Sequence, residues 1–536
     1  MNSEQTRSFS LGGALLLFCA SNLLISALFL WFKIGLQPVS LLISCVFALL
    51  FLGKKPAIAL VFTGIVGASF FVSSHFIDLS YDGAWYHQEA VIQLAHGWNP
   101  YHDAPVTPSV SKEAATWVNA FPKASWINAA TAMRAFGDIE SGKAFNWLLF
   151  LAAFFLLLDL FRQFSFRRSF ALALAVAVTA NPVIIYQLFS YYVDGQVAAL
   201  MTIVFALMIR VLLGLPARRT VVLLVAGLML LTNLKFTALI YGTALSGLFF
   251  IFCFHYRPRS RHYLWVAFTP MIGVALSVLI VGYNPYMTNY QRHRNVFYPV
   301  PIPFLSGSGN ASVPVMPVSN MPENFAGKSS IEKLLRSVTA FSGNITAPKS
   351  TRFKWPWQID VEEYRCFTIA DCRIGGFGPL FEAELVGAAI LLVLIFNIFG
   401  SESFVVLGML SAGIMGTTLL NPECWWARYV PQIWLIPCII SFFAVYPQLK
   451  VVKTRRRIGY VLIGLVCLNS LLIAGVYVRS QYRGTGKALE RLAAYQTQYQ
   501  TEGKPLAIDF GRFRSFRLKF EKAGIPYTEL GQLEYQ

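Results

Sequence analysis

Long apolar blocks separated by short hydrophilic breaks occupy most of the chain. A helix rises about 1.5 Å per residue, so a block of roughly 20 apolar residues is long enough to cross the hydrocarbon core of a bilayer. The blocks therefore predict an α-helical polytopic membrane protein with about 13 transmembrane helices. The predicted spans are 11–32, 37–53, 56–74, 144–161, 170–189, 196–214, 220–234, 237–255, 263–282, 380–399, 403–420, 430–447 and 458–478.

The hydrophilic breaks differ in charge, and Lys and Arg gather in every second one. Such clusters mark the cytoplasmic face of a membrane protein, so the N-terminus is predicted in the cytoplasm and the tail from residue 479 outside. No small-residue cleavage site clearly follows the first block, and we expect it to be a retained span rather than a signal peptide. The clusters are Lys54 with Lys55, Arg162 with Arg167 and Arg168, Arg218 with Arg219, Arg257 with Arg259 and Arg261, and Lys450 with Lys453, Arg455, Arg456 and Arg457.

The composition agrees with a membrane protein and argues against two other classes. Hydrophobic residues make up 56% of the chain and charged residues only 13%, with a mean hydropathy of +0.55. A soluble chain of 536 residues needs more charge than this to cover its surface. The net charge of +18 lies mostly in the short breaks, so it does not indicate a nucleic-acid-binding protein.

Two hydrophilic segments on the predicted outer face, 75–143 and 283–379, are too long to be simple connectors. Loops beyond about 15 residues usually carry function or structure of their own. We call these segments the first and second long loops. Cys366 and Cys372 lie six positions apart in the second one, and they can form a disulfide if that side of the membrane is oxidising.

The tail has the pattern of a small α/β appendage. It predicts a helix (Gly486–Gln500), a strand (Pro505–Asp509), a second helix (Arg514–Ala523) and a final short strand. The chain is therefore divided into a transmembrane module, 1–478, and an extracytoplasmic C-terminal appendage, 479–536.

The first long loop begins with a group of residues suited to acid–base chemistry. Asp78, Asp82, Tyr86 and His87 follow the end of a span within a few positions. A carboxylate at the membrane surface can accept the proton of a sugar or protein hydroxyl as that hydroxyl attacks. Asp is also a favoured N-cap, and Asp82 precedes a predicted helix beginning near Gly83. On this pattern, Asp82 can take part in catalysis, cap the helix, or do both.

The same stretch carries a resemblance to a known superfamily. Asp82-x-x-x-Tyr86-His87, closing with Gly97-Trp98-Asn99-Pro100-Tyr101, resembles the first extracytoplasmic loop of the GT-C glycosyltransferases, which use polyprenyl-phosphate-linked sugars. The resemblance implies a GT-C-like fold, a bacterial inner (plasma) membrane location, and a catalytic base at Asp82 with Asp78 in reserve. Two spans precede the one that leads into this loop, where the usual pattern has one.

Further short motifs extend the resemblance over roughly residues 80–430. They resemble the rest of the first loop, a Lys-bearing element in the middle of such chains, the start of the second long loop, and a late Arg-Tyr element. In the same order, these motifs are Asn119–Lys123 followed by Ile139–Lys143, then Asn233–Thr237, then Asn284–Asn289 with Phe297–Pro299, and finally Trp426–Tyr429.

Several ionisable residues at predicted span ends are candidates for binding the substrate. Ionisable groups at membrane depth are costly unless paired, which favours a role for Asp194 and Lys235. An Asp-Gly turn and a lysine reaching for the interface are the structural alternatives. A guanidinium such as that of Arg428, beside Tyr429, suits a phosphate, although it also suits an aromatic belt at the interface.

A second basic cluster, Arg292 and His293, lies just outside the span 263–282. It is equally consistent with binding a diphosphate, a sugar or lipid headgroups and with a solvated run of charge. No Asp-x-Asp pair or tight His/Cys/Glu cluster is found in the outer loops, so the sequence does not support a required divalent metal. The sequence leaves open whether Asp78, Asp82 and Asp194 come together around such an ion.

The function expected from these features is an inverting transfer of a sugar from a polyprenyl-phosphate donor. The acceptor is a glycan, a lipid-linked saccharide or another cell-envelope component on the extracytoplasmic side, and membrane lipids surround the protein. A polysaccharide polymerase or O-antigen-ligase-like enzyme, relying on Arg292 and His293, is the nearest alternative. A secondary transporter would be expected to show an inverted repeat, which this sequence does not show. A non-catalytic envelope-assembly protein would not need the group Asp82, Tyr86 and His87.

Overall fold

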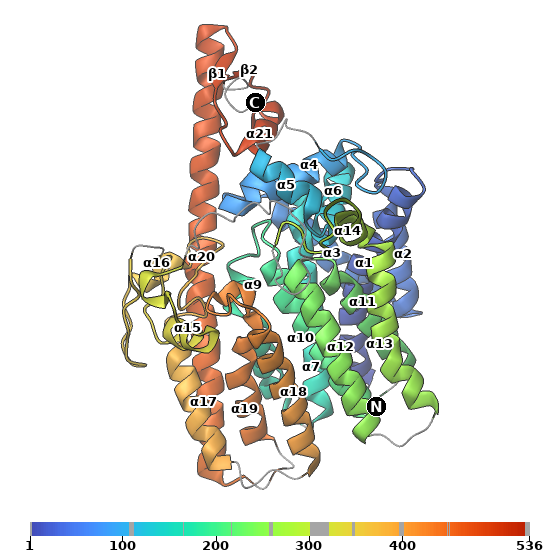
Figure 1. Cartoon of the computed structure of the whole chain (residues 1–536), viewed down its shortest axis with the longest axis vertical. Helices are drawn as coiled ribbons and strands as arrows, with labels where there is room; N and C mark the ends of the chain where they lie inside the picture. The colour runs from blue at the N-terminus through green and yellow to red at the C-terminus, as the bar shows by residue number, and fades with distance from the viewer. Residues whose placement is uncertain are drawn as a thin grey trace.

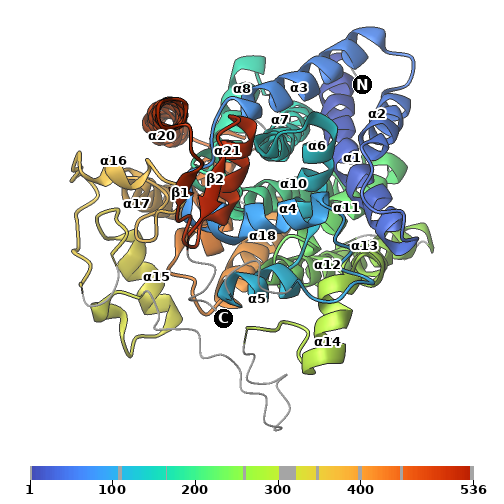
Figure 2. The same ribbon diagram turned by 90° about the horizontal axis from the view of Figure 1, so that it is seen from above.

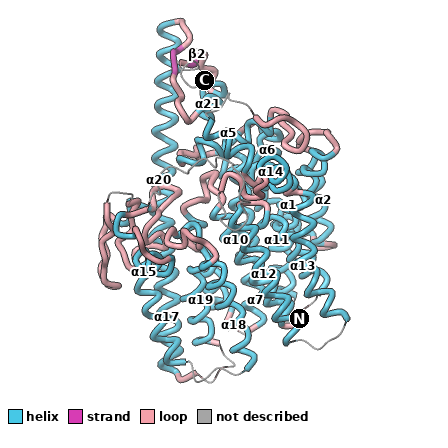
Figure 3. Tube along the Cα trace, in the orientation of Figure 1, coloured by secondary structure: helices cyan, strands magenta, loops and turns pink. Residues whose placement is uncertain are grey.

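The computed structural model shows a long bundle of helices that carries both long loops and the C-terminal residues toward one end (Figures 1 and 3). We call this the loop end of the bundle; the N-terminus lies toward the opposite end (Figure 1). The structure describes residues 3–106, 112–164, 166–215, 217–256, 261–300, 321–345, 349–395, 401–446, 449 and 451–530.

Helical segments are found in every predicted span, which confirms a mainly helical protein with several apolar helices. Among the described residues, six helices are long and apolar enough to cross a membrane, or seven if one bent pair counts as a single span. The count of 13 therefore stays a prediction. The bundle helices are α1 (Ser3–Trp31), α2 (Val39–Leu52), α3 (Pro56–Ser74), α7 (Ala144–Gln163), α8 (Arg168–Thr179), α10 (Asp194–Leu212), α11 (Ala217–Thr232), α12 (Phe236–Tyr256), α13 (Arg261–Ile280), α17 (Phe381–Ile395), α18 (Ser401–Leu419), α19 (Leu435–Val445) and α20 (Lys453–Glu502).

One predicted span, 170–189, is divided in the structure. Helix α8 ends at Thr179, and a short helix, α9 (Pro182–Ile185), follows. The residue before a proline is disfavoured in the helical conformation, and the Asn181 side chain instead accepts a hydrogen bond from the backbone N–H of Val183 at 3.0 Å. The break turns the chain at the loop end, just before Asp194 begins α10.

Small residues allow the bundle helices to approach closely. A Cβ atom placed on Gly12 of α1 would lie 2.9 Å from the backbone nitrogen of Leu156 in α7. Only glycine permits this distance, and such small residues are typical of helix contacts within membranes. Helix α1 therefore packs tightly along α7, and the core of the bundle forms around this pair.

Both long loops are folded. The first contains a helix at Ala124–Phe136, and the helix that the sequence predicts to begin near Gly83 is divided into η1 and α4. Its elements are η1 (Gly83–His87), α4 (Gln88–Ala95), α5 (Lys112–Ala120), α6 (Ala124–Phe136) and η2 (Ile139–Lys143). The described parts of the second contain η3 (Tyr283–Met287), α14 (Thr288–His293), η4 (Glu323–Phe325), α15 (Ser330–Val338) and α16 (Glu363–Cys366).

The last helix corrects the predicted tail. The span 458–478 and the helix Gly486–Gln500 were expected to be separate, but α20 runs through both without a break over 50 residues. At about 1.5 Å per residue it is about 75 Å long, so it crosses the bundle and extends beyond the loop end (Figure 1).

After α20 the chain turns back toward the bundle, where it has the strand–helix–strand order that the sequence predicts. It forms β1 (Leu506–Ile508), η8 (Arg514–Phe516), α21 (Arg517–Lys522) and β2 (Tyr527–Glu529). The two strands pair in parallel, with Leu506 opposite Tyr527. We call residues 505–530 the C-terminal module, and it lies over the first long loop near α4 (Figure 2).

The assignment of sides by charge stays a prediction. Three of its basic residues, Arg257, Arg259 and Lys450, lie outside the described residues.

A candidate active site at the loop end of the bundle

The guanidinium of Arg428 lies at the centre of a buried charge cluster. It belongs to the short turn η6 (Ala427–Tyr429), between α18 and α19. Its Nη1 is 3.2 Å from Asp82 Oδ2 and 3.5 Å from Asp194 Oδ2. Its Nε is 3.4 Å from Asp371 Oδ1. Three carboxylates from segments far apart in the sequence thus meet one guanidinium, and we call this group the Arg428 cluster.

Lys235 adds a second cation. It lies in the break between α11 and α12, and its Nζ is 2.6 Å from Asp194 Oδ1 and 4.0 Å from the centre of the Tyr429 ring. Asp194 therefore bridges both cations from the first position of α10, where the N-terminus of a helix also stabilises a negative charge. The Asn233 carbonyl accepts a hydrogen bond from Ala124 N at 2.9 Å and ties this break to the first long loop.

Aromatic rings enclose the Arg428 guanidinium. Its Cζ lies 4.6 Å from the centre of the Trp426 ring, 4.9 Å from that of Tyr192 and 5.0 Å from that of Tyr429. Planar guanidinium groups stack on aromatic faces, and this attraction grows when water is excluded. The rings therefore hold the guanidinium plane in place while leaving its N–H groups to the carboxylates.

Asp82 does not cap the helix that follows it. The residue already has helical backbone angles, and its side chain makes no capping hydrogen bond. The capping alternative is therefore wrong; the carboxylate reaches Arg428 instead. Burial raises the pKa of Asp82 above its usual value, and the nearby Arg428 guanidinium partly offsets this rise. A carboxylate with a raised pKa is a stronger base than an ordinary aspartate.

His87 is buried beside this position and is held neutral. Its Nδ1 accepts a hydrogen bond from Trp126 Nε1 at 2.7 Å, so the single proton of the neutral ring is on Nε2. Burial lowers the pKa of His87 to about 3. The Tyr86 ring stacks on this imidazole with 4.2 Å between the ring centres. Tyr86 and His87 thus form a stacked aromatic pair in the first long loop, one helical turn after Asp82 in the sequence.

The remaining candidates lie apart from the Arg428 cluster. Asp78 is buried, and its carboxylate accepts hydrogen bonds from Ser80 N at 2.9 Å and Tyr191 N at 2.8 Å. His293 stacks on Tyr298 with 3.6 Å between ring centres. Together with Arg292 it belongs to α14, which lies toward the edge of the loop end (Figure 2). The described contacts do not connect either α14 residue to the aspartates.

Sequence reasoning missed Asp371. Its Oδ1 also accepts a hydrogen bond from Trp426 Nε1 at 2.7 Å, so it holds both the guanidinium and one of the rings that enclose it. The residue directly precedes Cys372, and the suggested disulfide to Cys366 is present. This bond closes the short loop that presents Asp371. A carboxylate next to a paired cysteine in a long loop is the signal from which it could have been found.

An apolar groove lies beside the cluster between α12 and α13. Its volume is about 650 Å³, and its walls are almost entirely hydrocarbon. It reaches Leu239, which is one helical turn along α12 from Lys235. Its lining residues are Leu239, Ile240, Thr243, Ala244, Val274, Ala275, Val278, Leu279, Phe297 and Leu420.

The described residues contain no group of three or more His, Cys, Asp or Glu side chains arranged to hold a metal ion. The predicted convergence of Asp78, Asp82 and Asp194 is only partial: Asp82 and Asp194 meet, but they share a guanidinium, and Asp78 bonds to backbone N–H groups.

Comparisons with known proteins find likenesses among solved structures. No protein-family model matches it, and no curated protein does. It is similar to ArnT from Cupriavidus metallidurans in the apo state, with a TM-score of 0.44 and 10% identity over 89% of this chain and 86% of that one. A structure of ArnT from the same organism bound to undecaprenyl phosphate gives a TM-score of 0.41 and 13% identity over the same shares.

ArnT is a polytopic membrane glycosyltransferase of the GT-C family, the kind of protein that the loop motifs resemble. Likenesses at these TM-scores assign no role to any residue. The functional argument therefore rests on the contacts of this chain's own side chains.

Proposed function

We propose that this protein is a GT-C-type membrane glycosyltransferase. It transfers a sugar from a polyprenyl-phosphate-linked donor to a glycan, lipid-linked saccharide or other envelope acceptor on the extracytoplasmic side. The observation that carries the proposal is the Arg428 cluster: a carboxylate with the properties of a base, the buried cation of Arg428 and the largely buried cation of Lys235, beside an apolar groove. A lipid-linked phosphate sugar needs all three of these.

The donor is bound by the groove and the two cations. The hydrocarbon walls between α12 and α13 suit an isoprenoid chain, which is held there by close packing against apolar side chains rather than by removal from water. Lys235, one helical turn along α12 from the groove residue Leu239, provides a point charge for the phosphate, and Arg428 provides a planar fork. Asp194 holds both cations in place before the donor arrives.

Asp82 is the base of the transfer. The acceptor oxygen attacks the anomeric carbon and its proton passes to Asp82, while the bond from carbon to the phosphate oxygen breaks and its electron pair stays on the phosphate. Attack from the face opposite the leaving group inverts the anomeric centre. A phosphate bound to the same guanidinium competes with Asp82 for its N–H groups and adds negative charge nearby, which makes Asp82 a stronger base when the donor is bound.

The cations lower the barrier on the leaving side. Charge develops on the phosphate as the bond breaks, and a fixed guanidinium and ammonium in a site with little water stabilise it. Tyr86 and His87 orient the acceptor from behind Asp82. Because burial keeps the pKa of His87 near 3, the imidazole acts as a neutral hydrogen-bonding group rather than as a cationic acid.

The location rests on two further features. The basic breaks favour a cytoplasmic N-terminus, and the disulfide in the second long loop suits an oxidising side. Both agree with a site that opens outside a bacterial plasma membrane.

The test is Asp82→Asn, measured in cells as envelope glycans and accumulated lipid-linked sugar, and with purified protein as turnover. We expect turnover to fall by about 100-fold or more, the usual loss when a general base is removed, while polyprenyl phosphate still binds. The matched control is Glu362→Gln, an exposed carboxylate of the second long loop. Normal glycans and donor pools with folded, abundant Asp82→Asn protein would show that the proposal is wrong.

A further inference from the structure

The C-terminal module is fastened to the first long loop by ion pairs to buried carboxylates. Arg517 in α21 makes a two-pronged pair with Glu89 in α4: Nη1 to Oε2 and Nη2 to Oε1 are both 2.9 Å. The Glu89 side chain is fully buried. A buried carboxylate is costly without a partner, so the pair fixes where the module sits.

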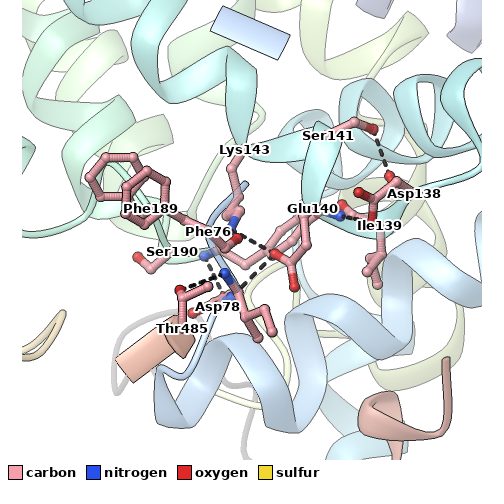
Figure 4. Close-up of polar contacts among 12 residues, drawn as sticks. Phe76, Asp78, Asp138, Ile139, Glu140, Ser141, Lys143, Phe189, Ser190 and Thr485 are labelled. Atoms are coloured by element: carbon pink, nitrogen blue, oxygen red, sulfur yellow. Dashed lines mark hydrogen bonds and ion pairs between the residues drawn. The ribbon is translucent and has the colours of Figure 1, made fainter. Parts of the chain in front are cut away.

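A second buried carboxylate, Glu140, is shared between the loop and the module. Lys143, from the same turn, lies 2.6 Å from its Oε2, and Lys519 of the module lies 2.5 Å from its Oε1. The Glu140 side chain is 2% exposed. Figure 4 shows its carboxylate between Lys143 and the backbone of Asp78. Two cations from different parts of the chain thus neutralise one carboxylate.

Glu140 holds the segment that leads to Asp82. Its Oε2 accepts a hydrogen bond from Asp78 N at 3.2 Å. The Asp78 carboxylate lies against the start of η1 so closely that a Cβ on Gly83 would be 2.2 Å from Asp78 Oδ2. A shift of Asp78 toward η1 would therefore press on the backbone next to Asp82.

The same carboxylate connects to the other side of the site. Asp78 Oδ2 accepts from Tyr191 N at 2.8 Å. The next residue, Tyr192, encloses Arg428, and its hydroxyl accepts a hydrogen bond from Asp82 N at 3.5 Å. Asp78, which lies outside the Arg428 cluster, thus joins two of the three segments that carry the aspartates of the cluster, those of Asp82 and Asp194.

Two neutral contacts complete the attachment. Thr485 of α20 accepts a hydrogen bond from Ile77 N at 3.1 Å (Figure 4). Ser515 of the module donates to the Ala84 carbonyl at 2.7 Å. Both contacts lie within five positions of Asp82 along the chain, on either side of it.

We propose that the C-terminal module is a clamp that sets the position of Asp82, with Lys519 and Arg517 as its positioning residues. Neither touches the proposed substrates. They act through Glu140 and Glu89, whose buried charges tie α4 and the 77–83 segment to the module. The expected effect of the clamp on turnover rests on the proposed function, whereas its expected effect on the order of the first long loop does not.

The experiment uses the full chain in nanodiscs and compares Lys519→Met with Lys519→Arg. A displacement of about 1 Å can reduce turnover by about 100-fold, so we expect Lys519→Met to lower kcat at least 10-fold and leave the donor KM within about 2-fold. Amide hydrogen exchange over residues 76–92 should rise in the same variant, measured without substrate. Lys519→Arg should restore both. The control Lys522→Met removes a 61%-exposed partner of Asp138 on the same helix and should change neither.

A second variant keeps the test decisive if Lys519→Met folds poorly. Arg517→Lys keeps a positive charge beside Glu89 but loses the two-pronged pair, so it should raise the hydrogen exchange of 76–92 and lower kcat in the same direction. Unchanged exchange and kcat in both Lys519→Met and Arg517→Lys would overturn the clamp. A chain that shows no transfer at all but responds in exchange as described would disprove the proposed function and leave the clamp standing.

Discussion

Arg428 Nη1 lies 3.2 Å from Asp82 Oδ2, although the two residues are 346 positions apart in the chain. The pair joins the turn between α18 and α19 to the start of the first long loop. It places the group suited to hold a phosphate next to the group suited to accept a proton. In the proposed transfer, each residue neutralises the other until a substrate binds one of them, so the base is not left unpaired when no donor is present.

The shape of the guanidinium predicts that Arg428→Lys is not a conservative change. Arg428 meets Asp82 and Asp194 through one nitrogen and Asp371 through another, and a single ammonium cannot reproduce that fork. We expect kcat/KM for the donor to fall by about 100-fold or more. Steady-state kinetics in nanodiscs measure this, with Arg365→Lys, an exposed arginine of the second long loop, as the control. Equal loss in both variants would contradict the prediction.

The pH dependence of turnover follows from two pKa values of opposite shift. Asp82 must be deprotonated to accept the proton, and burial raises its pKa above that of an ordinary aspartate. Activity should therefore be complete above the raised pKa and fall as the pH drops through it. His87, with a pKa lowered to about 3, should add no second step near neutrality. A profile of kcat/KM from about pH 4 to pH 9 shows one acid limb if this is right, and a step near pH 6–7 that His87→Gln removes if it is not.

The disulfide predicts a dependence on the loop that it closes. Cys366 and Cys372 are paired, and the loop between them ends at Asp371, which contacts Arg428 and Trp426. Without the bond the loop samples more conformations, so the carboxylate is less often in place. We expect Cys372→Ser to lower turnover by about 10-fold.

Two further variants test whether the disulfide acts through Asp371. Asp371→Asn should have a similar effect and should add little when combined with Cys372→Ser, because both changes remove the same contact. Cys45→Ser, at an unpaired cysteine of α2, should leave turnover unchanged. Additive losses in the double variant would mean that the disulfide acts elsewhere.

Part of the site could be predicted because charge at a span end is rare. Asp82, Asp194, Lys235 and Arg428 all stand next to apolar blocks, where an unpaired charge is costly. Each was therefore a candidate before the fold was known, and the fold brings all of them into one cluster. Their pairing with each other was not visible in the pattern, because it depends on how α10, α11 and η6 meet.

Other features had no such signal. Asp371 lies in a polar loop among several carboxylates, and only the folded position of that loop distinguishes it. Lys519 belongs to a basic tail segment that resembles a solvated surface, yet it reaches a buried carboxylate in the first long loop. The continuous α20 was missed because hydropathy falls after residue 478, whereas the helical hydrogen bonds continue to Glu502 on good helix formers.

The groove between α12 and α13 makes a prediction about the length of the donor lipid. Ala275 lines the groove, so Ala275→Trp should fill part of its 650 Å³ and exclude isoprenoid units without touching the cations. We expect the KM for a long-chain polyprenyl donor to rise at least 10-fold, and the KM for an analogue with one or two isoprene units to change little. The value of kcat should stay within about 2-fold, because the lost contacts are the same in the ground state and the transition state. The control is Ile272→Trp, an exposed position of α13 that does not line the groove. If both variants raise the KM of long and short donors alike, the lipid chain binds elsewhere.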